Sequence, residues 1–170
     1  MCYIVFQSLY ICAMKITLLA IGKTDDKNLQ ILMDTYMRRL GHYLSFQLEI
    51  IPDIKKVKNL SQEQQKEGEG NEILKKVSSS DVMILLDENG KMYNSVEFSE
   101  FLQKKMNSGI KQLVFVIGGP YGFSDALYKR AQGKISLSSM TFSHQMVRLF
   151  FIEQLYRACT ILKNEPYHHR

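Results

Sequence analysis

Several features that mark other classes of protein are missing from this chain. It has no internal repeat, no low-complexity segment and no C-x-x-C pair, and its only cysteines are Cys2, Cys12 and Cys159. An odd number of cysteines without a framework argues against a zinc site and favours a reducing compartment. We therefore predict a cytoplasmic protein without a bound metal.

The first 13 residues are apolar and carry no charge. A signal peptide needs a basic leading segment, which these residues lack, and a membrane span needs about 20 apolar residues. Met14 then opens the sequence Met-Lys-Ile-Thr-Leu, which reads like a natural start. We interpret residues 1–13 as an extension outside the fold, with an extra edge strand as the alternative. No membrane partner is expected.

The composition allows one hydrophobic core. The chain has 170 residues, of which 45% are hydrophobic, so residues 14–170 are expected to form a single domain. Twenty-two Lys and Arg against 17 Asp and Glu give a net charge of +5. This excess is compatible with a polyanionic partner but does not demonstrate one, because many proteins carry solvated lysine faces.

The hydrophobic pattern predicts strands that alternate with helices. Strands are expected at 16–21, 46–50, 82–86, 113–117 and 135–137. Helices are expected at 25–40, near 73–77, from Ser95, from Ser124 and at 143–163. The polar segment 55–70 is interpreted as an exposed loop that runs into a helix, and Lys55, Lys56 and Lys58 either stay solvated or contact phosphate. This alternation is typical of an α/β fold with a mainly parallel sheet.

Three of the predicted strand ends have unusual sequences. In open α/β sheets ligands bind beyond the carboxyl ends of strands, here a turn at 87–90 and the segments 118–122 and 137–142. The glycines of segment 118–122 let a ligand approach the backbone, but they match neither G-x-G-x-x-G nor a P-loop. A plain tight turn is therefore an equally good interpretation of this segment. Segment 137–142 could offer polar backbone groups and apolar walls to an adenine, or it could form an ordinary Ser/Thr-rich loop with a helix cap.

The final helix and the tail carry the remaining candidates. His144 could be a general base or a helix-capping histidine, and Arg148, four residues later, is expected on the same helix face. Glu153 and Arg157 have the spacing of an ion pair. The tail, residues 166–170, is either frayed or able to stack on a base and contact phosphate. Its adjacent histidines do not have zinc-ligand spacing.

Taken in order, these segments resemble the ribosomal RNA large subunit methyltransferase H family, which belongs to the knotted SPOUT methyltransferases. The resemblance rests on I-G-G-P-Y-G at 117–122, L-S-S-M-T-F-S-H-Q-M-V-R at 137–148, E-Q-L-Y-R-A at 153–158 and P-Y-H at 166–168. The start at 14–23, the Glu-Gly stretch near Gly68 and I-L-L-D at 84–87 also fit. One departure is Ser143, where the family has proline, and serine can cap the helix instead.

The resemblance implies a fold and a cofactor. The fold would be an α/β SPOUT domain, a mainly parallel sheet flanked by helices, with a trefoil knot near the C-terminus. Such knots are rare exceptions to the rules of chain connection. The cofactor would be S-adenosylmethionine, bound by Leu86, Gly118, Leu137, Ser138, Ser139, Met140, Thr141 and Phe142.

The resemblance also implies a substrate, the helix 69 pseudouridine of 23S rRNA in an assembled ribosome. The enzyme would methylate its N3 as a homodimer, with the substrate pocket completed across the interface. N3 carries a proton at neutral pH, and His144 and His168 are candidate bases. Tyr167 could orient the pseudouridine, while Arg148 and Arg157 could hold phosphate or stabilise developing charge. The alternatives are a ribosome-binding protein without catalysis and a SPOUT methyltransferase that acts on another RNA.

Overall fold

The computed structural model describes residues 14–54 and 60–168 as one parallel sheet with helices between its strands. In the sheet the strands lie in the order β2-β1-β4-β3-β5. The elements are β1 (Lys15–Ile21), α1 (Lys27–Leu40), β2 (Ser45–Ile51), α2 (Gln62–Leu74), β3 (Val82–Met92), α3 (Ser95–Asn107), β4 (Gln112–Ile117), α4 (Asp125–Arg130), β5 (Gly133–Ser136) and α5 (Met146–Leu162). The predicted α/β class is confirmed. The predictions for residues 1–13 and for Lys55, Lys56 and Lys58 lie outside the described residues.

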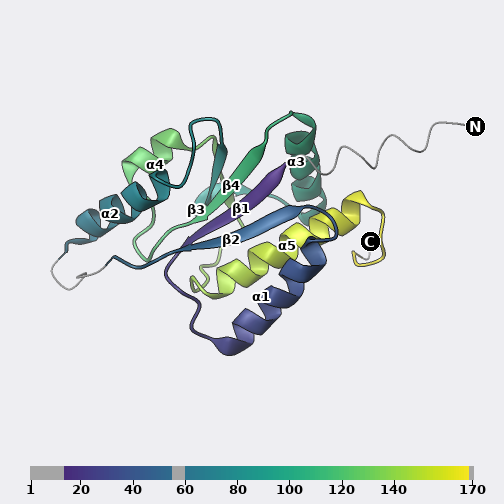
Figure 1. The fold of residues 1–170 in the computed structure, drawn as a ribbon, viewed down its shortest axis with the longest axis horizontal. Coiled ribbons are helices and arrows are strands. Elements are labelled where there is room, and N and C mark those ends of the chain that lie inside the picture. The colour runs from purple at the N-terminus through teal and green to yellow at the C-terminus, as the bar shows by residue number, and fades with distance from the viewer. Residues whose placement is uncertain (1–13, 55–59, 169–170) are drawn as a thin grey trace, which may run out of the picture.

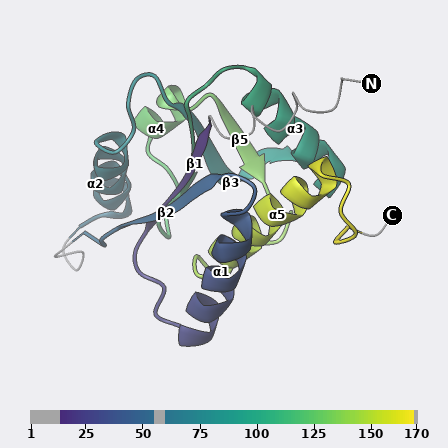
Figure 2. The ribbon, with the colours of Figure 1, turned by 45° about the vertical axis from the view of Figure 1, so that its right-hand side comes forward.

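Helices cover both faces of the sheet. Helices α1, α3 and α5 pack on one face, and α2 and α4 pack on the other (Figures 1 and 2). Successive side chains of a strand point to opposite faces. Phe115 of β4 therefore packs in the core on the side of α1, α3 and α5, while Val114 and Val116 pack in the core on the side of α2 and α4. Burial on both faces explains why β4 reads as a continuous apolar run. No helix in the described ranges is long and apolar enough to cross a membrane.

The caps of helix α1 agree with the sequence analysis. The Asp26 carboxylate accepts hydrogen bonds from the backbone N–H groups of Asn28 at 2.8 Å and Leu29 at 3.1 Å. These bonds satisfy two of the N–H groups that a helix start leaves open. Gly41 follows the last helical residue, as predicted.

The segment 55–70 differs from its predicted loop, because helix α2 already covers its second half. Ser61 and Gln64 form a capping box at the start of that helix. Glycine lowers helix propensity, which is why the sequence favours a loop here. Gly70 is nevertheless required, since a Cβ at this position would collide with the side chain of Ser124. Packing against another segment therefore overrides local propensity.

The turn predicted at residues 87–90 lies inside the span of β3 instead of ending it. The residues on its two sides both pair with Ile135 of β5, so residues 87–90 leave the ladder as an excursion. Within it, Asp87 Oδ1 accepts a hydrogen bond from the N–H of Asn89 at 2.7 Å. This contact is the local bond that aspartate makes in turns.

Two further helix starts are corrected by small shifts. Asn94, rather than Ser95, caps α3, and it forms a capping box with Glu97. Asparagine and serine cap about equally well, so the sequence does not separate them. Helix α5 begins at Met146, later than predicted. The prediction that His144 shares a helix face with an arginine four residues on is therefore wrong, because His144 precedes the helix.

Candidate functional site

A cavity of about 590 Å³ lies at the excursion of β3 and at the carboxyl ends of β4 and β5. These three strands are neighbours in the sheet, so the excursion of β3 and the loops that follow β4 and β5 converge at one edge. The lining comes from residues 86–89, 117–123 and 135–142 without Ser139, together with Lys66, Asp125, Tyr128, His144 and Val147. Its volume and position are those of a small-molecule site in an open α/β sheet.

The structure places most of the predicted cofactor residues around this cavity. The residues that line it are Leu86, Gly118, Leu137, Ser138, Met140, Thr141 and Phe142, and Ser139 does not line it. Leu137 lies just beyond β5, which ends at Ser136 instead of including Leu137 as predicted. The role of these residues in cofactor binding stays a prediction.

The glycine loop is both a tight turn and a wall of the cavity. Gly122 has a φ of +81°, a conformation that glycine adopts without steric cost, and it pairs with Gly119 in an isolated bridge. A Cβ at Gly118 would lie 2.9 Å from the ring of Phe123. The two readings of this loop are therefore compatible, because the close turn is what presents its backbone to the cavity.

Three carboxylates are part of the cavity. Asp87, Glu88 and Asp125 all belong to its lining. The hydroxyl of Tyr128, on α4, donates a hydrogen bond to Asp87 Oδ2 at 2.6 Å, and Lys134 Nζ lies 5.2 Å from the centre of the Tyr128 ring. Burial, reinforced by this bond, raises the pKa of Tyr128 to about 12. The bond ties α4 to the excursion of β3.

A buried acid behind the glycine loop was missed by the sequence analysis. Glu69 of α2 is 4% exposed, and its Oε1 accepts a hydrogen bond from Gln65 Nε2 at 2.8 Å. Burial raises the pKa of the Glu69 carboxyl. The local sequence does not indicate that Glu69 is buried, because Glu69 lies among other charged and polar residues of the same helix.

Of the two candidates around the start of α5, only His144 lines the cavity. Arg148 is 1% exposed, and its guanidinium donates to Thr24 Oγ1 and to the carbonyl of Ile21, each at 2.7 Å. Burial lowers the pKa of Arg148. In this chain Arg148 therefore fastens α5 to the end of β1, whereas His144 faces the cavity.

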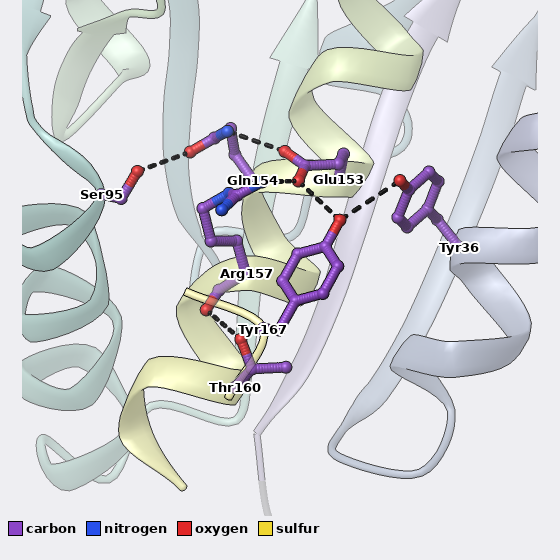
Figure 3. A network of polar contacts seen from close by, with 7 residues as sticks. All are labelled: Tyr36, Ser95, Glu153, Gln154, Arg157, Thr160 and Tyr167. Atoms are coloured by element: carbon purple, nitrogen blue, oxygen red, sulfur yellow. Dashed lines mark hydrogen bonds and ion pairs between the residues drawn. The ribbon is translucent and has the colours of Figure 1, made fainter. Parts of the chain in front are cut away.

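Tyr167 lies in a separate polar network along the middle and the C-terminal part of α5 (Figure 3). Its hydroxyl donates to Glu153 Oε1 at 3.0 Å and lies 3.2 Å from the hydroxyl of Tyr36. Arg157 pairs with Glu153 at 2.6 Å, which confirms the predicted ion pair, and its guanidinium lies 4.8 Å from the centre of the Tyr167 ring. Burial and these hydrogen bonds raise the pKa of Tyr167.

Within one chain the tail and the cavity are apart. Neither Tyr167 nor His168 lines the cavity. Val147 lines it at the start of α5, whereas Arg157, which stacks on Tyr167, lies ten residues later. At 1.5 Å per residue this corresponds to about 15 Å along the helix. The candidates therefore form two groups, one at each half of α5.

A family model described as a predicted SPOUT methyltransferase matches residues 14–168. The chain belongs to the SPOUT methyltransferase family. Proteins named Ribosomal RNA large subunit methyltransferase H from Flavobacterium johnsoniae and Flavobacterium psychrophilum are each 72% identical to it over 157 residues, which are 92% of this chain and 100% of each relative. One of the same name from Christiangramia forsetii is 66% identical over the same shares. The resemblance seen in the sequence is thus confirmed.

A solved structure supports the SPOUT fold independently. It is titled as the structure of a probable methylase family protein from Haemophilus influenzae Rd KW20. The TM-score is 0.52 at 14% identity, over 93% of this chain and 72% of that one, so the likeness concerns the fold alone. The trefoil knot implied by the resemblance stays a prediction. Among the residues described for this SPOUT chain, no three His, Cys, Asp or Glu side chains are grouped as metal ligands.

Proposed function

We propose that this chain is an S-adenosylmethionine-dependent methyltransferase that acts in the cytoplasm on N3 of the helix 69 pseudouridine of 23S rRNA. The observation that carries the proposal is the cavity at the excursion of β3 and the ends of β4 and β5, where segments of the family resemblance converge. The family supports methyl transfer. The names of the relatives support ribosomal RNA as the substrate class.

The residues around the cavity fit this cofactor. Leu137, Met140 and Phe142 supply apolar walls for an adenine. The carboxylates of Glu88 and Asp125 supply negative charge for a cationic ligand. When bound, S-adenosylmethionine supplies the methyl group that N3 of the pseudouridine accepts. The cavity would hold the ligand in place, and such positioning supplies much of the acceleration of a transfer reaction.

The chain must also accept the proton of N3 and hold the pseudouridine in place. His144 is the candidate base inside the cavity. Tyr167 and His168 belong to the group at the other half of α5, so they would reach the cavity of a second copy more readily than their own. We therefore include a homodimer in the proposal, with the tail of one chain completing the site of its partner and an assembled ribosome as the target.

The test of this function is methylation of ribosomes from a strain that lacks the gene, followed by mass mapping of the modified nucleotide. We expect one added methyl group on the helix 69 pseudouridine, and only when S-adenosylmethionine is present. A methyl group elsewhere in the ribosome or in tRNA would refute the substrate. Absence of any heat in calorimetry with S-adenosylmethionine would instead favour a binding protein without catalysis.

The tail is tested by ending the chain after Glu165. We expect this truncation to abolish methylation while the dissociation constant for S-adenosylmethionine stays within about twofold, because the removed residues that the structure describes, 166–168, do not line the cavity. Mixing it with a full-length Gly118→Ala variant, whose added methyl crowds Phe123, should restore activity if tails act across the dimer. Wild-type activity of the truncation alone would contradict any role of the tail, and failure of the mixture would contradict its action across the dimer.

A further inference from the structure

A carboxylate occupies the space directly behind the glycine loop of the cavity. A Cβ added to Gly119 would overlap the carboxylate of Glu69, at 2.7 Å from its carboxyl carbon. The φ of Gly119 is not in the left-handed region, so its backbone would tolerate a side chain. The obstacle at position 119 is therefore Glu69 and not backbone strain.

The two oxygens of this carboxylate differ in their hydrogen bonding. Oε1 accepts a hydrogen bond from Gln65 Nε2. Oε2 makes no aligned hydrogen bond, but the backbone N–H of Gly119 lies close enough to lower the pKa of Glu69, against the larger opposing effect of burial.

Burial of a carboxylate with incomplete hydrogen bonding costs free energy. An apolar side chain of similar size would pack between α2 and the loop at lower cost. The position of Glu69 is therefore better explained by its effect on the loop than by its contribution to the core. Gly119 is the link, because it touches the carboxylate on one side and lines the cavity on the other.

We propose that Glu69 is a positioning residue of the cofactor site. Its carboxylate fills the space behind Gly119 and attracts the N–H of that residue, so that residues 118–122 keep the conformation that forms the cavity wall. Glu69 does not line the cavity and acts only through this loop. The inference rests on the proposed function, in which the cavity takes S-adenosylmethionine.

The test compares Glu69→Ala, Glu69→Gln and the control Glu72→Gln, which makes the same charge change at an exposed site of α2. Calorimetry measures binding of S-adenosylmethionine and of S-adenosylhomocysteine, which lacks the sulfonium charge. We expect Glu69→Ala to weaken both ligands equally, by about tenfold. Glu69→Gln and the control should bind like the wild type, because an amide at 69 can accept from Gly119 and donate to Gln65 once the Gln65 amide turns.

Other outcomes contradict the proposal. Wild-type affinity of Glu69→Ala would show that the loop does not depend on this side chain. A loss confined to S-adenosylmethionine, equal in Glu69→Ala and Glu69→Gln, would show that the carboxylate attracts the sulfonium through its charge. If the wild type binds neither ligand, the proposed function itself fails, which is distinct from a failure of the Glu69 variants alone.

A second pair of variants keeps the test valid if Glu69→Ala is less stable. Gly119→Ala adds a methyl group where the carboxylate lies, so we expect it to weaken both ligands as well. In the double variant Glu69→Ala/Gly119→Ala the new methyl group enters the vacated space. Its affinity should therefore be closer to the wild type than that of either single variant. Additive losses, with thermal melts showing that all variants are folded, would overturn the proposal.

Discussion

Replacing Arg148 by methionine tests whether this arginine holds the fold or the RNA. Its residue type suggests a phosphate contact, whereas the structure buries its side chain to 1% exposure. Its two terminal nitrogens donate to Thr24 Oγ1 and to the carbonyl of Ile21, each at 2.7 Å. Methionine keeps much of the apolar length of the side chain and removes both donors.

The expected magnitude follows from these two bonds. A hydrogen bond that involves a charged group contributes about 1.5–3 kcal/mol to stability. The loss is partly offset because the variant no longer buries a guanidinium, whose pKa burial already lowers. We therefore expect the free energy of unfolding of Arg148→Met to fall by about 2–4 kcal/mol. For a domain of this size the melting temperature would fall by roughly 5–15 °C.

Urea unfolding followed by circular dichroism, without RNA or cofactor, measures this loss. The matched control is Arg38→Met on the exposed side of α1, which should change the free energy of unfolding by less than about 0.5 kcal/mol. Unchanged stability of Arg148→Met together with lost methylation would refute the structural role of Arg148. This result would instead support a contact between Arg148 and RNA.

Two further side chains give independent predictions. Tyr128→Phe removes only the hydroxyl that donates to Asp87, and calorimetry should show S-adenosylmethionine binding weakened by about two- to tenfold. The pKa of Tyr128 is raised to about 12 in the folded protein, from 10.0 in the unfolded chain. The neutral hydroxyl therefore stabilises the fold fully below pH 10, and this contribution is lost as the pH rises toward 12. The free energies of unfolding of wild type and variant should converge over that range. Burial raises the pKa of Cys159 to about 12, so its thiol should resist iodoacetamide at pH 8 in native protein and react in urea, as peptide mass spectrometry would show.

The strands could be predicted from the sequence because burial on both faces leaves a strong local signal. The predicted strand 113–117 differs from the observed β4 by one residue, Gln112. The site could also be located, since the carboxyl ends of parallel strands lie at one edge of a sheet. The order of the strands could not be predicted, because it depends on which strands pair across the chain. That order places the excursion of β3 beside the loops that follow β4 and β5.

The features that the sequence did not reveal depend on pairs of residues far apart in the chain. Position 70 of helix α2 is a glycine because a side chain there would collide with Ser124. Gly119 is a glycine because Glu69 fills the space behind it. Seen alone, Gly70 indicates an exposed loop, and Gly119 indicates a tight turn or a close approach of a ligand. Arg148 is a similar case, since residue type suggests a phosphate contact and only the fold reveals its bonds inside the chain.

Helix α5 connects the two groups of candidate residues and fixes their separation. Its first turn lines the cavity through Val147, and Arg148 fastens that end to β1. The middle of the helix carries Glu153, which accepts a hydrogen bond from Tyr167 of the tail. Because a helix is stiff over this length, Tyr167 could reach its own cavity only by leaving Glu153. In the proposed homodimer, the tail would keep these bonds while it approaches the cavity of the partner. A site shared between two chains therefore stays part of the proposal, and this separation is the reason for it.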